Sequence, residues 1–400
     1  MIDLGRYTKL LLLVLTVLHL GTMVRSTMSE LQQADGLIQA NGAAPVGGDF
    51  INMFAAARLV LDGRSSEIYQ PEAFMAFERT IIPHDIGLRL WAYPPHSLLA
   101  VWPLGWMEFW GALTLWSALG LAVLVWGARR AGFDWIETAI IALSPAALAS
   151  VYFGQTGNLA AGLLLLALSG KRGGLGAPIS AALLTIKPQA GFLLPVLWLV
   201  ERKWSAILIA GGLTIAFGLL SLAVFGPALW IDYLGPTMSA LNALEHHGSG
   251  PFMAMIPSVF IAVRILAADP MLAGYAQAAI ALLAGAFAVW RLIRTDDERA
   301  RWAIVIAAMA LITPYVHIYD LASLMAAALL VLSRWRIAPL GGQALVAMLA
   351  LAVWALPLIT VVANTVGFPA GPVVIALLLL SAGLSLSPSS AFAQTEKSPI

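Results

Sequence analysis

The chain has 400 residues and a formal net charge of +1; 60% of its residues are hydrophobic and only 11% are charged. Soluble domains usually carry about 25% charged residues, so the composition excludes an ordinary soluble domain and predicts a membrane protein. The sequence contains no cysteine, which excludes disulfides, thiolate metal sites and cysteine nucleophiles. No basic tract suggests nucleic acid as a partner.

The N-terminal segment places Arg6 and Lys9 before the apolar run "LLLLVLTVLHLG". This pattern resembles a signal peptide, but no convincing cleavage site follows, so we interpret it as an uncleaved first span. Further apolar runs predict helices, because backbone groups inside a bilayer must pair within their own helix. Together they predict an all-α polytopic membrane protein, with twelve spans expected near residues 9–24, 109–127, 135–152, 158–169, 175–187, 190–200, 205–225, 272–292, 302–315, 320–333, 339–361 and 371–387.

The stretch Pro94–Met107 is ambiguous between a re-entrant segment and one arm of a helical pair. We therefore expect about 10–13 transmembrane helices, several of them short for a bilayer crossing. Residues 1–390 are expected to form a single membrane domain, and residues 391–400 a polar C-terminal tail.

Lysine and arginine in short loops are retained on the cytoplasmic side. A consistent topology results if six basic groups lie inside, namely Arg6/Lys9, Arg129/Arg130, Lys171/Arg172, Arg202/Lys203, Arg291–Arg301 and Arg334/Arg336. A first outer loop (25–93), a second outer loop (226–270) and the turns "FGQTGN", "IKPQ" and "TPYVHIYD" then share the opposite face. Polar side chains near membrane depth usually face a cavity, so we expect an outward-facing cavity there.

The first outer loop carries two segments with apolar residues at helical spacing, "DFINMFAAARLVLDG" and "QPEAFMAFERTI". We expect both to be amphipathic helices that lie in the plane of the membrane interface. Asp49 opens the first of them. Aspartate is a favoured N-cap, so Asp49 is either a cap, a chemical group, or both.

Lys187 stands between apolar runs in "AALLTIKPQAGFLLPVLWLV". A charge at the bilayer centre costs about 2.5–3.5 kcal/mol, so this lysine is expected near an interface or opposite an anion. It could snorkel to the headgroups. Alternatively it could bind a phosphate as a point charge, together with Gln189 two residues further on.

Other polar residues on the predicted outer face are candidates for lining a substrate groove. Tyr93 and His96 in "YPPH" could instead mark an interfacial entry into a helix. Gln155 and Asn158 in "FGQTGN" could satisfy a tight turn between helices.

Two histidine motifs complete the candidate set. His317 and Asp320 lie three apart, and a structural His–Asp hydrogen bond is as plausible for them as a role in the groove. His246 and His247 are also groove candidates, but two adjacent histidines alone make a poor metal site. No phosphate loop, zinc helix or nucleophile elbow is present, so we expect no metal and no cofactor.

The order and spacing of "GGDF", "AAARLVLDGRSSEIYQPEAF", "YPP", "FGQTGN" and "KPQAGFLLPVLWLVERKW" resemble the bacterial and archaeal polytopic glycosyltransferases of family 87. The resemblance runs from about Gly47 to Lys203 and more weakly to Asp320. It implies the C-type glycosyltransferase (GT-C) fold and a polyprenyl-phosphate sugar donor used on the outer face of the plasma (inner) membrane. It also implies an acid in the first outer loop, a position that Asp49 matches.

The resemblance implies a hexosyltransferase, with mannose the expected sugar and a lipid or glycan as acceptor. Asp49 would act as general base in an inverting displacement, and Lys187 and Gln189 would bind the donor phosphate. A transporter or flippase of lipid-linked sugars is the alternative, because transporters also place polar groups at membrane depth. A non-catalytic scaffold would leave Lys187 and the outer polar cluster unexplained.

Overall fold

The computed structural model describes residues 4–33, 46–82, 89–171, 173–239, 241 and 248–384. Every element among these residues is helical, and the prediction of an all-α membrane protein is confirmed. The α-helices are α1 (Leu4–Gln33), α2 (Phe50–Leu61), α3 (Pro71–Ile81), α4 (Leu98–Val101), α5 (Phe109–Arg130), α6 (Trp135–Ala142), α7 (Pro145–Phe153), α8 (Gly157–Leu168), α9 (Gly176–Leu184), α10 (Leu194–Val200), α11 (Trp204–Phe225), α12 (Ala228–Asp232), α14 (Pro251–Ala254), α15 (Val259–Ala267), α16 (Pro270–Arg294), α17 (Glu298–Ile312), α18 (Ala322–Arg334), α19 (Leu340–Thr365) and α20 (Gly371–Gly383).

Short helical turns connect several of these helices. They are η1 (Ser65–Glu67), η2 (Pro95–Ser97), η3 (Trp102–Trp106), η4 (Pro188–Ala190), η5 (Tyr233–Thr237), η6 (Ile318–Asp320) and η7 (Trp335–Ile337). The ambiguous stretch Pro94–Met107 consists of η2, α4 and η3, three short pieces of which none is long enough to cross a bilayer.

Within the described residues, five helices are long and apolar enough to cross a membrane: α1, α5, α11, α16 and α19. A sixth crossing results if α6 and α7, which bend by 47° at their junction, act as one broken span. The remaining expected spans are also helical where the structure describes them: α8 and α17 are about as long as expected, whereas α9 and α10 are shorter. The expectation of about 10–13 crossings therefore depends on helices below the usual length of about 20 residues.

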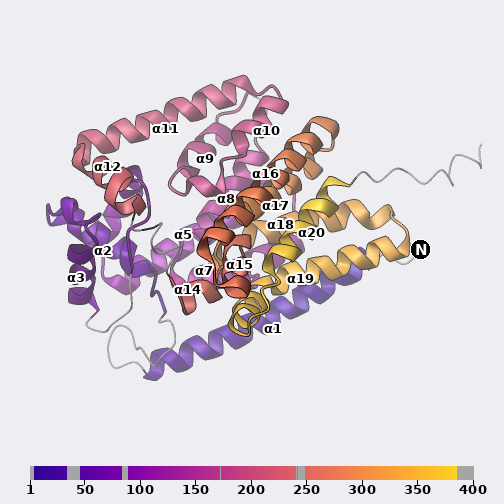
Figure 1. Cartoon of the computed structure of the whole chain (residues 1–400), viewed down its shortest axis with the longest axis horizontal. Helices are drawn as coiled ribbons and strands as arrows, with labels where there is room; N and C mark the ends of the chain where they lie inside the picture. The colour runs from indigo at the N-terminus through magenta and orange to yellow at the C-terminus, as the bar shows by residue number, and fades with distance from the viewer. Residues whose placement is uncertain are drawn as a thin grey trace, which may run out of the picture.

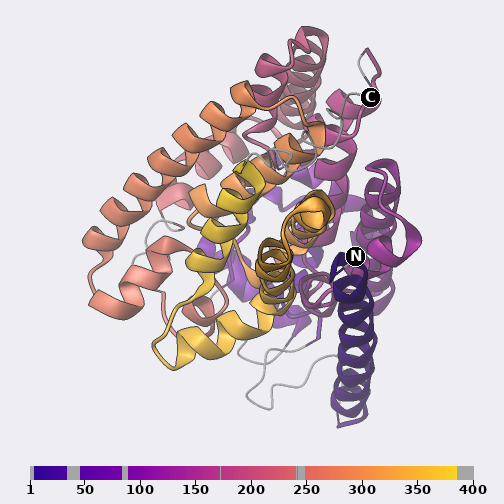
Figure 2. The same cartoon turned by 90° about the vertical axis from the view of Figure 1, so that its right-hand side faces the viewer.

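The helices α8, α17 and α18 form the centre of the molecule, with most of their side chains buried (Figure 1). Around them, α1 runs along the outside beside α19 (Figure 2). A helix that is apolar on all sides suits either a protein core or lipid. The central helices lie in the protein core. The helix α11, which has one buried residue, suits a lipid environment.

The helix α2 is more buried than the sequence predicts. Eight of its twelve residues are buried, including Phe50 and Phe54, which pack against Phe109 at the start of α5. The expected exposed polar face of an amphipathic helix is largely missing, because its alanines allow other segments to approach the helix on several sides. By contrast α3 is amphipathic, and it buries only Phe74 and Glu78.

The hairpin of α17 and α18 separates two polar regions of the molecule. At one end of the hairpin, Arg301 pairs with Glu201 and Asp296, and Arg334 pairs with Asp297. At the other end lies the turn that contains η6. Helices of 15 and 13 residues place these ends about 20 Å apart, so the basic clusters and the turn lie at opposite ends of the bundle.

Candidate functional site

The segment that carries Asp49 is fixed by its backbone against the end of α7. The amide of Gly47 donates to the carbonyl of Tyr152 at 2.6 Å, and the amide of Asp49 donates to that of Phe153 at 3.2 Å. Asp49 occupies the N-cap position of α2, but its side chain makes no capping hydrogen bond. The interpretation of its carboxylate as a helix cap is therefore wrong, and the carboxylate is available for other contacts.

Two side chains hold the carboxylate of Asp49. Arg89 forms an ion pair with Oδ1, and Gln155 donates to Oδ2 at 3.0 Å. The side chains of the pair are only 17% and 16% exposed. A carboxylate has about four acceptor sites, so these two contacts leave lone pairs for another donor. Arg89 was not among the predicted site residues. Only its position in the same loop, four residues before Tyr93, pointed to it in the sequence.

A continuous hydrogen-bond chain leads from Asp49 to Lys187. The Tyr93 hydroxyl donates to Oε1 of Gln155 at 3.0 Å and contacts the Thr156 hydroxyl at 3.2 Å. Lys187 Nζ donates to that same hydroxyl at 3.4 Å. Asp49, Gln155 and Lys187, which were all expected on the outer face, thus belong to one polar network. Thr156 is the member that the sequence analysis missed, although it lies inside the "FGQTGN" motif.

Lys187 forms an ion pair with Asp320, at 2.5 Å from Nζ to Oδ1. Their side chains are 8% and 10% exposed, and the ring of Tyr319 lies 5.6 Å from Nζ. A lysine that snorkels to the headgroups would expose its ammonium, so burial argues against that interpretation. The anion that the apolar surroundings of Lys187 require is supplied by Asp320, from the turn between α17 and α18.

Two glycines allow three distant segments to meet at this network. A Cβ on Gly157 would lie 1.9 Å from the carbonyl oxygen of Tyr319, and one on Gly154 would lie 2.5 Å from the Cβ of Phe50. Gly154 also has φ +68°, a left-handed conformation that glycine adopts without strain. The "FGQTGN" turn therefore brings α2 and η6 to the start of α8 by close backbone approach.

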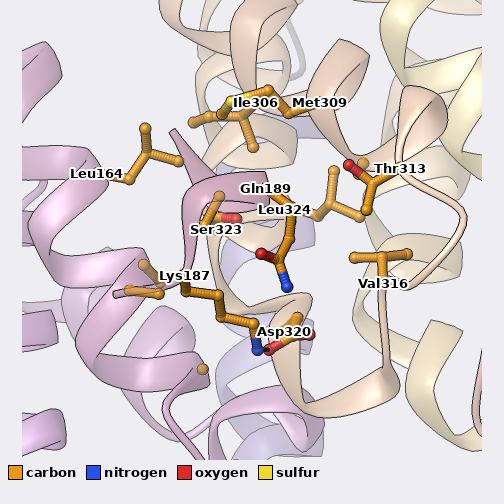
Figure 3. Close-up of a pocket in the computed structure, with 15 residues that line it drawn as sticks. Leu164, Lys187, Gln189, Ile306, Met309, Thr313, Val316, Asp320, Ser323 and Leu324 are labelled. Carbon is orange, nitrogen blue, oxygen red and sulfur yellow. Dashed lines mark hydrogen bonds and ion pairs between the residues drawn. The ribbon is translucent and has the colours of Figure 1, made fainter. Parts of the chain in front are cut away.

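A cavity opens beside the Lys187–Asp320 pair, between α8, α17 and α18 (Figure 3). The space open to the centre of a water molecule is about 50 Å³, and all empty space, open solvent included, is about 510 Å³. Lys187, Gln189 and Asp320 lie at one end, whereas Leu164, Ile306 and Met309 lie at the other (Figure 3). The cavity is thus apolar with a charged end. Asp49 and Gln155 are not among its lining residues.

The other predicted site residues that the structure describes do not line this cavity. His96 stacks on Trp230 and contacts the Thr185 hydroxyl at 3.2 Å, and burial lowers its pKa. Asn158 donates to the carbonyl of Ala147 at 3.0 Å, so its amide joins α7 to α8. His246 and His247 lie outside the described residues.

His317 borders the network through its neighbours. Its ring stacks on Tyr319 with centroids 5.0 Å apart, and its backbone N–H donates to Asp320 Oδ2 at 3.3 Å. The expected His–Asp contact therefore runs through the backbone and not the ring. Burial lowers the pKa of His317, and the charge of Asp320 opposes that shift.

Glu78 is a buried acid that the sequence analysis missed. It lies on α3 with no exposed surface, and neither carboxyl oxygen has a hydrogen-bond partner. Burial raises its pKa to about 8, while the charges of Arg89 and Arg79 act in the opposite direction. Glu78 follows the buried Phe74 by four residues, so helical spacing alone could have placed it on the inner face of α3.

No group of three metal-ligating side chains occurs in the part of the chain that the structure describes. A family model described as glycosyltransferase family 87 matches residues 91–314, which is more than half of the chain. The matched range contains Tyr93, Gln155 and Lys187, whereas Asp49 and Asp320 fall outside it. No curated protein and no solved structure matches the chain. The chain belongs to glycosyltransferase family 87 and is a membrane glycosyltransferase.

Proposed function

We propose that the protein transfers a hexose, with mannose the expected sugar, from a polyprenyl-phosphate sugar to a lipid or glycan acceptor. The observation that carries this proposal is the polar network that starts at Asp49 and ends at Lys187, where it reaches the charged end of an apolar cavity. A lipid-phosphate donor needs both features, a cation for its phosphate and an apolar surface for its chain. The topology rule for basic loops favours an active site on the outer face of the membrane. The plasma membrane and the GT-C fold are what the family resemblance implies.

In the proposed reaction, Asp49 accepts the proton of the acceptor hydroxyl as that oxygen attacks the anomeric carbon of the sugar. The bond from this carbon to the phosphate oxygen breaks, and the phosphate leaves with the electron pair. General-base assistance of this kind contributes typically about 10²–10⁴-fold. Gln155 supports the step by holding one carboxylate oxygen of Asp49 in place.

Lys187 is proposed to bind the donor phosphate, with Gln189 beside it at the same end of the cavity. An ammonium has three donors, and its contacts with Asp320 and Thr156 use two of them. The third remains for a ligand oxygen. A cation placed where the leaving phosphate gains charge lowers the barrier, since such stabilisation is strong in a water-poor site.

Purified protein in lipid nanodiscs, assayed with a panel of polyprenyl-phosphate sugars and a membrane-lipid extract as acceptor, tests this function. We expect transfer from a polyprenyl-phosphate hexose and none from a soluble nucleotide sugar. If the protein, reconstituted in vesicles, moved lipid-linked sugars across the vesicle membrane without transferring the sugar to an acceptor, the transporter alternative would be supported. Transfer from nucleotide sugars would contradict the donor class.

A further inference from the structure

The phosphate site proposed for Lys187 already contains an anion, the carboxylate of Asp320. Both oxygens of this carboxylate are held, Oδ1 by Lys187 Nζ at 2.5 Å and Oδ2 by the backbone N–H of His317 at 3.3 Å. Asp320 also lies two residues before the start of α18, where the positive end of a helix favours negative charge. These contacts keep the carboxylate beside Lys187, so the two groups together carry no net charge.

A site of this kind distinguishes ligands by their charge. The phosphodiester of a polyprenyl-phosphate sugar carries one negative charge. The monoester that remains after transfer carries about −1.5 to −2 at pH 7, because its second pKa is about 6. Each added negative charge is repelled by the fixed carboxylate, and this repulsion is poorly screened where both side chains are about nine-tenths buried.

We propose that Asp320 makes the phosphate site selective for the singly charged phosphodiester donor over the doubly charged monoester product. The inference rests on the proposed function of Lys187 as the donor-phosphate contact. Asp320 then weakens product inhibition, since the leaving group gains a charge as it departs and is repelled from the site. Lys187 alone would attract the doubly charged monoester more strongly than the diester, and Asp320 offsets that added attraction.

Two inhibitors that share one lipid chain test this selectivity. One is polyprenyl phosphate, a monoester, and the other is its methyl ester, a phosphodiester with a single charge. Inhibition constants for both are measured on wild type, Asp320→Asn and the control Asp297→Asn. The control changes an ion-paired aspartate at the opposite end of the α17–α18 hairpin.

In Asp320→Asn we expect the monoester to gain at least about tenfold in affinity relative to the methyl diester. The ratio of the two inhibition constants should be unchanged in Asp297→Asn. Asp320→Glu, which retains the charge, should keep a ratio within about threefold of wild type. If Asp320→Asn does not fold, Asp320→Ser is a second neutral variant, because its small hydroxyl leaves room for water beside Lys187.

The outcomes separate this inference from the function on which it rests. If the neutral variant still transfers sugar and its ratio of the two inhibition constants equals that of wild type, the selectivity role of Asp320 is overturned. The proposed function is then unaffected. If the neutral variant loses turnover while the ratio of the two inhibition constants is unchanged, Asp320 takes part in the chemical step. This result also overturns the inference. Absence of transfer from any polyprenyl-phosphate sugar contradicts the function itself.

Discussion

Gln155 donates a hydrogen bond to the carboxylate of Asp49 at 3.0 Å, although 106 positions separate the two residues. The contact exists because Gly154 lets α2 begin directly against the turn that carries Gln155. A neutral amide can orient an acid without taking its negative charge. Gln155 is therefore a positioning residue for Asp49, and the chemistry of the pair depends on the carboxylate.

The substitution Asp49→Asn tests this carboxylate. Asparagine keeps the size of the side chain but cannot accept the acceptor's proton, so turnover should fall by at least about 10²-fold. Because Asp49 makes no capping hydrogen bond, a change in thermal stability would report the altered contacts with Arg89 and Gln155. Turnover with saturating donor and the unfolding midpoint are the measurements.

Asp62→Asn is the matched control, since Asp62 is an exposed aspartate at the other end of the same helix. It should retain transfer activity. Near-native activity in Asp49→Asn would reject Asp49 as the base and leave Asp320, beside His317, as the next candidate.

The sequence placed Asp49, Gln155 and Lys187 in one region because basic loops fix the topology. It indicated that Lys187 needs an anion, since a lone buried charge is costly. It could not identify Asp320 as that anion, because the choice depends on how α17 and α18 pack against α8. The ion pair of Arg89 was not predictable for the same reason.

Helical spacing gave the positions of α2 and α3 but not their environments. The sequence pattern of α2 suits an interfacial helix, yet packing from several sides buries it. The helix α3 is amphipathic as its pattern predicts, but its buried face also carries the acid Glu78. Periodicity therefore predicts a helix face and not what covers it.

Glu78 predicts a pH dependence of stability. Its folded-state pKa is about 8, above the ordinary value of 4.5. Between these values the folded protein holds a proton that the unfolded chain releases, so the free energy of unfolding falls as pH rises through this range. Glu78→Gln should remove that slope, because a buried amide has no proton to lose. Unfolding midpoints in detergent at pH 5 and pH 9 measure the difference.

The exposed Glu72 on the same helix provides the comparison. Glu72→Gln should keep the wild-type loss of stability between the two pH values. If Glu78→Gln retained the same loss, other groups would account for the slope and Glu78 would not be a buried neutral acid.

Gly157 is predicted to tolerate no side chain. A Cβ there would lie 1.9 Å from the carbonyl oxygen of Tyr319, so Gly157→Ala must push η6 away from α8. Overpacking of this kind costs about 1–3 kcal/mol, and it should also separate Asp320 from Lys187. We expect a lower unfolding midpoint together with reduced transfer.

Gly176→Ala serves as the control, because no atom lies within 4 Å of the added methyl group. Alanine in a helix is favoured over glycine by up to about 1 kcal/mol, so this variant should be as stable as wild type or more so. Full activity in Gly157→Ala would show that the turn can move without disturbing the site.

Lys187 is predicted to determine donor affinity. Lys187→Ala should raise the KM for the donor by about 10- to 100-fold, the usual range for losing a hydrogen bond to a charged group. Lys187→Arg should rescue binding only in part, because a planar guanidinium does not replace a compact ammonium. Lys171→Ala, which removes an exposed lysine from a loop, should leave the KM unchanged.

Loss of Lys187 also leaves Asp320 buried without its cation, and an unpaired buried charge is strongly destabilising. The double variant Lys187→Ala/Asp320→Asn separates the two effects. It should recover the unfolding midpoint that Lys187→Ala loses, while the KM for the donor stays high. If the double variant regained donor affinity along with stability, Lys187 would be a structural partner of Asp320, and the donor phosphate would have to bind elsewhere, with Arg89 the next cation in the network to test.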